Sequence, residues 1–168
     1  MPYLRLWFYD PGGDTEGYLN HFVAKLDGPY CHCEVQFPDE VACTIYMGTS
    51  VVLKKRSFNP SAYTCVNVSC TMEQMRLARG FAEREFKAGT EFSTMAMSMA
   101  LIPLLSISGK GTFCSKLCAD ILVAGQILEP GVSTHKMSPS ALFRITSKSP
   151  PKNSPAKATG PVAPIGFK

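Results

Sequence analysis

The sequence predicts an α+β protein in which an antiparallel meander precedes a set of helices. Residues 1–69 are filled by short segments of alternating or β-branched character, separated by turns rich in glycine, proline and asparagine. From residue 71 onward, longer segments carry apolar residues at helical spacing. With 168 residues, 45% hydrophobic and 18% charged, the chain has the size and composition of a single globular domain.

Five strands are expected in the first part of the chain. The first, residues 3–9, stops at the turn Asp10-Pro11-Gly12-Gly13, and a short helix is expected from Asp14 to Leu26. The turns Pro38-Asp39-Glu40, Gly48-Thr49 and Asn59-Pro60-Ser61 then delimit four more strands, at 30–37, 41–46, 50–55 and 63–69.

Helices are expected in the second part. A capping box at Thr71 and Gln74 and a closing Gly89 bound the clearest one. Its predicted buried stripe consists of Met72, Met75, Ala78, Ala82 and Phe86. Further helical segments are predicted, in part, at 91–107, where Pro103 is a break, at 114–128 and, as a short capped turn, at 138–143.

The folded domain is expected to span residues 1–146, followed by a disordered tail at 147–168. The tail contains five prolines, four lysines and no acidic residue, so it accounts for the whole net charge of +4. The remaining domain is formally neutral, which gives no basis for nucleic-acid binding by the folded part. The proline spacing of the tail, including Pro161-Val162-Ala163-Pro164, is typical of a linker or docking segment.

The chain is expected to be soluble and cytoplasmic. No N-terminal stretch has the pattern of a signal peptide, and the apolar run Met95–Ile107 is too short to span a bilayer. Seven cysteines, an odd number placed within predicted strands and helices, favour free thiols in a reducing compartment.

Two segments are predicted to form the halves of one active site. In Tyr30–Phe37 the strand alternation places His32, Glu34 and Gln36 on one face. A carboxylate two residues from a histidine on the same face can hold the imidazole tautomer while the other ring nitrogen accepts a proton. The alternative for this pair is a solvent-facing edge strand.

The second half is the segment Gly111–Cys118, a glycine-flanked turn that leads into an apolar helix with Cys114 at its start. Backbone N–H groups and the positive end of the helix dipole favour a thiolate there. The pattern predicts Cys114 as nucleophile, His32 as base and Glu34 as the group that orients it, although a buried structural cysteine is an equally open alternative. Tyr9 and Gln36 are further candidates for oxyanion or substrate contacts.

The remaining cysteines and histidines are expected to be structural. Cys118, one helical turn after Cys114, is expected to pack in the core, and the two other histidines are His21 in the first helix and His135 in a loop. Zinc is disfavoured because Cys31 and Cys33 flank His32 on a strand, where they cannot chelate together with it. No metal or cofactor is expected. Small apolar core positions are predicted for Cys31, Cys33, Cys43, Cys65 and Cys70.

Over residues 1–146 the chain resembles the circularly permuted, NlpC-type branch of the papain-like cysteine hydrolases, which includes bacterial YiiX-like proteins and a poxvirus member. The resemblance rests on three motifs in the permuted order: His-x-Glu-hydrophobic at 32–35, Phe-Cys-Ser-x-Leu at 113–117 and Ser-Pro-Ser-Ala-Leu at 138–142. It implies a small, partly rolled antiparallel sheet packed against the cysteine-bearing helix. It also implies the triad Cys114, His32 and Glu34, with an oxyanion hole that includes the Cys114 backbone N–H.

The resemblance implies a thiol hydrolase or transferase that acts on a peptide, amide or other acyl substrate through an acyl-enzyme, located in a host-cell cytoplasm or a virion if the source is viral. Two alternatives stay open. One is a lipid-acting esterase or acyltransferase, although the Asn-Cys-Glu-His-like motif of the lecithin retinol acyltransferase type is absent at 113–116. The other is an inactive papain-like module that binds partners, through its tail among other surfaces.

Overall fold

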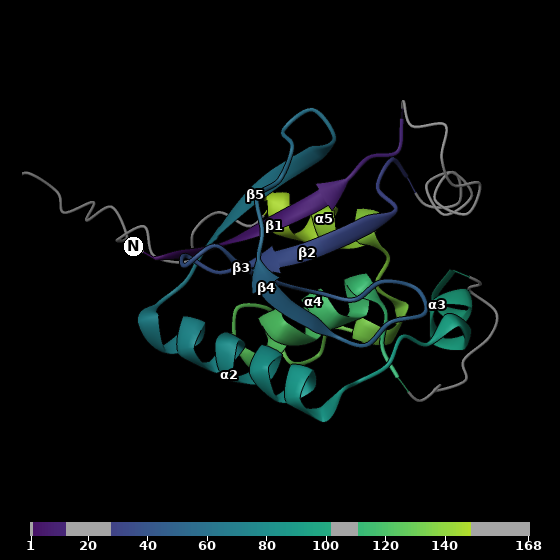
Figure 1. Cartoon of the computed structure of the whole chain (residues 1–168). Helices are drawn as coiled ribbons and strands as arrows, with labels where there is room; N and C mark the ends of the chain where they lie inside the picture. The colour runs from purple at the N-terminus through teal and green to yellow at the C-terminus, as the bar shows by residue number, and fades with distance from the viewer. Residues whose placement is uncertain (1, 13–27, 102–110, 149–168) are drawn as a thin grey trace, which may run out of the picture.

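The structure, a computed structural model, describes residues 2–12, 28–101 and 111–148. In these ranges the chain forms an α+β fold with one five-stranded antiparallel sheet and four α-helices (Figure 1). The predicted helix at 14–26 with His21, the end of the predicted 91–107 segment and the tail from residue 149 lie outside the described residues.

All five predicted strands are present, each within its predicted bounds. They are β1 (Tyr3–Tyr9), β2 (His32–Gln36), β3 (Val41–Thr44), β4 (Val52–Lys55) and β5 (Tyr63–Ser69). The expected uninterrupted meander is wrong at its last strand, because the order in the sheet is β4-β3-β2-β1-β5. β5 pairs with β1, where Val66 and Val68 lie opposite Leu6 and Leu4 and extend the apolar face of the sheet.

The connection from β4 to β5 therefore crosses one face of the sheet from edge to edge. Phe58 in this connection stacks on Trp7 of β1, with ring centroids 4.5 Å apart. Arg56 at its start reaches Glu34 of β2. Trp7 and Glu34 are register partners and so share a face of the sheet, opposite to the apolar face that carries Leu6 and Val35. The crossing segment covers the part of that second face that carries Trp7 and Glu34, while Cys65 of β5, on the same face, stays exposed.

The helix α2 (Met72–Ala88) confirms the prediction made from its caps. The Thr71 and Gln74 side chains form a reciprocal capping box, and Gly89 closes the helix in the left-handed conformation, with a φ of 62°. The predicted stripe is narrower than expected, since Ala78 and Ala82 are buried while Met72 and Phe86, at the two ends of the helix, are exposed.

The later helices differ from prediction at their ends. They are α3 (Thr94–Leu101), α4 (Cys114–Ala124), the 3₁₀ turn η1 (Thr134–Lys136) and α5 (Pro139–Lys148). α4 ends four residues early because Gly125 breaks it and Gln126 takes a positive φ of 54°. α5 is longer than the predicted turn, since Ser138 caps it and Pro139 begins it, and it carries residues 147–148 of the predicted tail into the domain.

The helix α4 packs against β2 and β3 and is flanked by α2 and α5 (Figure 1). Its inner side, with Leu117, Cys118, Ile121 and Leu122, is fully buried against the apolar face of the sheet. This packing places the first residue of α4 beside the first residues of β2. In the parts of the chain that the structure describes, no helix has both the length and the apolar character needed to cross a membrane.

Candidate active site

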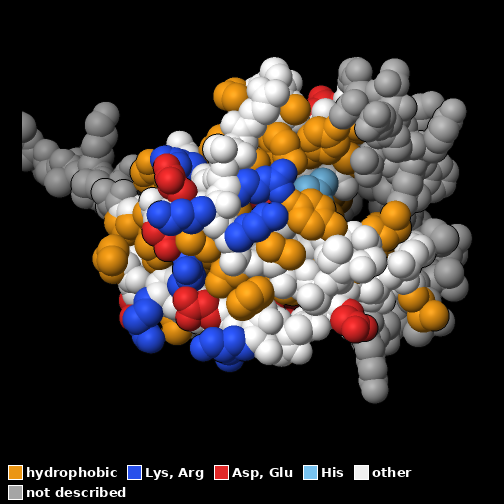
Figure 2. Space-filling model, viewed as in Figure 1, with side chains coloured by type: hydrophobic (Ala, Val, Ile, Leu, Met, Phe, Trp, Pro, Cys, Tyr) orange, Lys and Arg blue, Asp and Glu red, His pale blue; other side chains and the backbone are white. Residues whose placement is uncertain are grey.

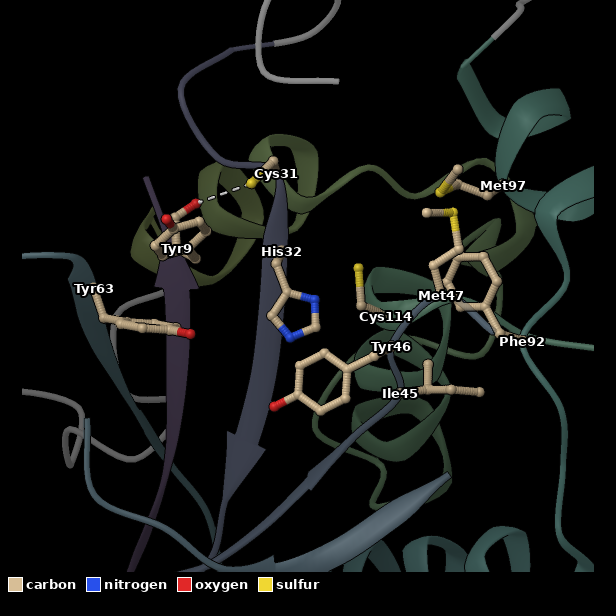
Figure 3. Close-up of a pocket in the computed structure, with 10 residues that line it drawn as sticks. All are labelled: Tyr9, Cys31, His32, Ile45, Tyr46, Met47, Tyr63, Phe92, Met97 and Cys114. Atoms are coloured by element: carbon tan, nitrogen blue, oxygen red, sulfur yellow. Dashed lines mark hydrogen bonds between the residues drawn. The ribbon is translucent and has the colours of Figure 1, made fainter. Parts of the chain in front are cut away.

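The structure brings His32 and Cys114 together across 82 residues of sequence separation, at the junction of β2 and α4 (Figure 3). The two side chains lie beside one another, and each shifts the pKa of the other. Both are largely buried, with 7% of Cys114 and 15% of the His32 side chain exposed, and both line one cavity. A thiol and an imidazole in direct contact at a cavity wall are the arrangement that nucleophilic cysteine catalysis requires.

The backbone before Cys114 holds the thiol at the helix start. Gly111 adopts a φ of 95°, and a Cβ there would lie 2.8 Å from the Cβ of Ser93. Thr112 exchanges backbone hydrogen bonds with Glu91 and Ser93, which fixes the approach to the helix. Phe113 is the N-cap and supplies no side-chain cap. The first intrahelical bond runs from Leu117 to the Phe113 carbonyl, so the N–H groups of Cys114, Ser115 and Lys116 have no partner within the helix.

On the side away from Cys114, the imidazole of His32 contacts Glu34 and Thr44. Its Nε2 lies 3.4 Å from Oε1 of Glu34 and 3.1 Å from the hydroxyl of Thr44. Because a carboxylate only accepts hydrogen bonds, Glu34 favours a proton on Nε2 and leaves Nδ1 as the nitrogen that exchanges a proton with Cys114. The ring of Tyr46 stacks on the imidazole, with centroids 5.1 Å apart, and limits its rotation (Figure 3).

Glu34 is fully buried and is neutralised by a residue that sequence reasoning missed. Nη1 of Arg56 lies 2.8 Å from Oε1 of Glu34, and the Tyr46 hydroxyl donates to the same oxygen over 3.2 Å. Arg56 also donates to the hydroxyls of Tyr46 and Tyr63. An unpaired carboxylate at this depth would be costly, so Arg56 is the group that balances the charge of Glu34 behind His32.

The electrostatics of the cluster favour a thiolate–imidazolium pair. A hydrogen bond from Cys33 lowers the pKa of Cys114, burial opposes this, and the charge and hydrogen bond of His32 lower it further, so that it lies well below its ordinary value. Burial disfavours the charged imidazole, but the contacts with Cys114 and, after them, those with Glu34 raise the pKa of His32 from 6.5 to about 10. Each partner thus stabilises the charged form of the other.

Cys33 has a role that its prediction as a core filler did not include. It is fully buried on the side of β2 that faces α4, next to the thiols of Cys114 and Cys118. Burial and these contacts raise its own pKa well above the ordinary value, so Cys33 stays a neutral thiol and acts as the donor. Strand alternation on β2 predicts that Cys33 points into the core. It cannot predict that Cys33 lies next to the Cys114 sulfur, because Cys114 belongs to a helix that is distant in the sequence.

The cavity beside the thiol has a volume of about 230 Å³. It is lined by Tyr9, Cys31, His32, Ile45, Tyr46, Met47, Tyr63, Phe92, Met97 and Cys114. The candidate Tyr9, at the end of β1, is therefore at the site, with its ring packed 5.2 Å from that of Tyr63. Residues from β1, β2, β5, α3 and α4, from the β3–β4 turn and from the segment before α3 meet here.

Gln36 does not reach the cavity. Its side chain accepts a hydrogen bond from the Trp7 indole over 2.9 Å and donates to the Arg56 carbonyl over 2.7 Å. Gln36 thus ties the crossing segment to the sheet. It supports the site through Arg56 and does not contact the reacting thiol.

The other cysteines and histidines were predicted to have no part in catalysis, and one of the cysteines predicted to lie in the core does not. Cys118 is fully buried, as expected, and Cys43 and Cys70 are buried too. Cys65 is exposed, so its prediction as a core residue is wrong: it lies on the outer face of the edge strand β5. His135 is exposed in η1 and contacts Ser133.

In the described ranges, no group of three or more His, Cys, Asp or Glu side chains is arranged to hold a metal ion. Comparisons of the chain with protein-family models, with curated proteins and with solved structures found no match.

Proposed function

We propose that this chain is a cysteine hydrolase of the circularly permuted, NlpC-type papain-like class, with Cys114 as nucleophile, His32 as general base and acid, and Glu34 as the orienting group. The observation that carries the proposal is the Cys114–His32–Glu34 series. In it a thiol at a helix start contacts an imidazole whose opposite nitrogen is held by a buried carboxylate.

The geometry supports an acyl-enzyme mechanism. The Cys114 sulfur attacks the carbonyl carbon of an amide, peptide or thioester, and the oxyanion accepts a hydrogen bond from the Cys114 backbone N–H, with the Tyr9 hydroxyl as the candidate second donor. The His32 imidazolium then gives its proton to the leaving group as the bond to the carbonyl carbon breaks. In the second half, His32 takes a proton from water, the hydroxide attacks the thioester, and the acid leaves as the thiol is restored.

Glu34 keeps the imidazole in its working orientation. Its pairing with Arg56 supplies the opposite charge that a fully buried carboxylate needs. Thr44 and Tyr46 restrict the same ring from the β3 side.

The first test is a pH-resolved alkylation of the folded protein, read cysteine by cysteine by mass spectrometry. Cys114 is expected to react fastest and well below pH ~8.5, the pKa of an ordinary thiol. Cys118, one turn further along α4, is the matched internal control. The fast reaction should be lost in His32→Ala. Equal reactivity of Cys114 and Cys118 would instead favour a non-catalytic binding module and contradict the proposal.

A further inference from the structure

The cavity beside Cys114 differs in character on its two sides. Figure 3 shows Tyr9, Tyr63 and Cys31 on the side of His32, and Met47, Phe92 and Met97 on the opposite side of the Cys114 sulfur. The first side presents phenol rings with hydroxyl groups. The second side is formed by two thioethers and a phenyl ring, with Ile45 below them. Among the described residues that line the cavity, His32 is the single ionisable base, and there is no Asp, Glu, Lys or Arg.

The proposed mechanism decides which part of a substrate lies on which side. The imidazolium must donate its proton to the leaving group, so the leaving group lies on the side of His32. The acyl part of the substrate then extends away from His32, over Met47, Phe92 and Met97. The described residues of that half offer an acyl group no charged partner, so a charged acyl group would lose its hydration there without compensation.

The lining also favours a flexible, unbranched acyl group. Methionine side chains are unbranched and polarisable, and they adapt to chains of varying shape. Met47, which lines the cavity, is 55% exposed. On the face shown in Figure 2, hydrophobic side chains lie above and below the histidine in view, and Lys or Arg side chains lie beside it. At about 230 Å³ the cavity lies below the range of about 300–1,000 Å³ that is typical of sites for drug-sized ligands, so it fits a short or medium chain.

We propose that Met47, Phe92 and Met97 form an acyl subsite that selects an uncharged, unbranched aliphatic acyl group for transfer to Cys114. This inference rests on the proposed cysteine hydrolase function and names its substrate class. In the transfer, a bond forms between the Cys114 sulfur and the acyl carbon, the bond to the leaving nitrogen, oxygen or sulfur breaks, and the thiol proton passes through His32 to the leaving group. Water then releases the fatty acid.

The experiment uses the full chain and nitrophenyl esters of acetic, butanoic, hexanoic, octanoic and dodecanoic acids, with nitrophenyl succinate and a nitrophenyl ester of an acetylated dipeptide as comparisons. Nitrophenolate release gives kcat/KM, and intact-mass measurement detects the acyl group on Cys114, with Cys114→Ala as the blank. The expected result is a rise in kcat/KM of about fourfold for each methylene until the cavity is filled. The succinyl ester is expected to be the poorest substrate.

Two residues of one helix provide a matched pair of variants. Met97→Lys places an ammonium in the subsite and is expected to abolish the dependence on chain length, whereas Met95→Lys, at an exposed position of α3 outside the cavity lining, should leave it unchanged. Met97→Leu should retain it. If Met97→Lys does not fold, Met47→Lys decides, because that exposed side chain tolerates a charge.

The outcomes separate the two proposals. Absence of any acylation that depends on Cys114 would contradict the hydrolase function and with it the subsite. Acylation of Cys114 at rates independent of chain length, or fastest with the succinyl or dipeptidyl ester, would overturn the acyl subsite while the hydrolase function stands.

Discussion

Arg56 and Glu34 form an ion pair in which the two partners differ sharply in exposure. Glu34 is fully buried, while 26% of the Arg56 side chain is exposed, and the atoms of the pair are 2.8 Å apart. Arg56 belongs to the segment that crosses the sheet between β4 and β5. Its guanidinium contacts the Glu34 carboxylate, which in turn contacts His32. The β4–β5 connection, which departs from a simple meander, thus supplies the cation that pairs with Glu34 behind His32.

Because the two partners differ in exposure, removing Arg56 and removing Glu34 should lower the free energy of unfolding by different amounts. Arg56→Met leaves a buried carboxylate without its cation and should lower the free energy of unfolding by about 3–5 kcal/mol. Glu34→Gln leaves a guanidinium that water can reach, and it should cost only about 1–3 kcal/mol. Urea unfolding of both variants measures the difference, with Arg76→Met, which breaks an exposed pair with Glu73, as a control of no measurable effect. Equal costs, or a larger one for Glu34→Gln, would contradict this account.

The pH dependence of acyl transfer follows from the pKa shifts of Cys114 and His32. The thiolate of Cys114 is the nucleophile and its pKa is lowered, so the acid limb of kcat/KM should lie well below the ordinary thiol value. The protonated His32 must donate to the leaving group, and its pKa is raised to about 10, so activity should fall as the pH rises through that value. The measurement is a pH profile of nitrophenolate release. In His32→Gln the acid limb should move to higher pH, and an unmoved limb would show that His32 does not stabilise the thiolate.

The hydrogen bond from Cys33 predicts an effect on reactivity from a buried residue that no substrate touches. Cys33→Ala removes the donor and should raise the pKa of Cys114, so the acid limb of its alkylation moves to higher pH. Cys33→Ser keeps a hydroxyl donor and should retain most of the wild-type profile. Cys43→Ala, a buried cysteine on the neighbouring strand β3, is the control for packing loss alone. A shift of the same size in Cys43→Ala would assign the effect to packing.

The glycine before the cysteine helix predicts a local backbone requirement. Gly111→Ala combines a positive φ with a Cβ that would lie 3.0 Å from the Glu91 carbonyl and closer still to Ser93. We expect a loss of about 1–3 kcal/mol in unfolding free energy together with reduced alkylation of Cys114, because the strained turn displaces the helix start. At Gly131 a Cβ meets no atom within 4 Å, so Gly131→Ala should change stability by less than about 0.5 kcal/mol. Similar results for both variants would remove the special role of the Gly111 turn.

Local patterns were enough to predict several elements and the candidate residues. The capping box at Thr71 and the closing Gly89 delimited α2, since caps act through neighbouring backbone groups. Short alternating or β-branched segments between turns identified all five strands. The pairing of His32 with Glu34 follows from their spacing on one strand, and the placement of Cys114 at a helix start follows from the glycine and threonine before it. The end of α4 was missed, because the apolar pattern continues past the Gly125 break.

Sequence by itself therefore determined the α+β class, the strand segments and the residue types of the site. Tertiary structure alone decided that β5 joins β1, which sends Arg56 and Phe58 across the sheet onto Glu34 and Trp7. It also decided that Cys33 faces Cys114, that Gln36 turns toward Trp7, and that Met47, Phe92 and Met97 share a cavity with the thiol. The physical reason is the distance in sequence over which each interaction acts. Helix caps and strand periodicity depend on contacts within a few residues. Strand order and ion-pair partners depend on which distant surfaces bury the most apolar area and leave the fewest charges unpaired.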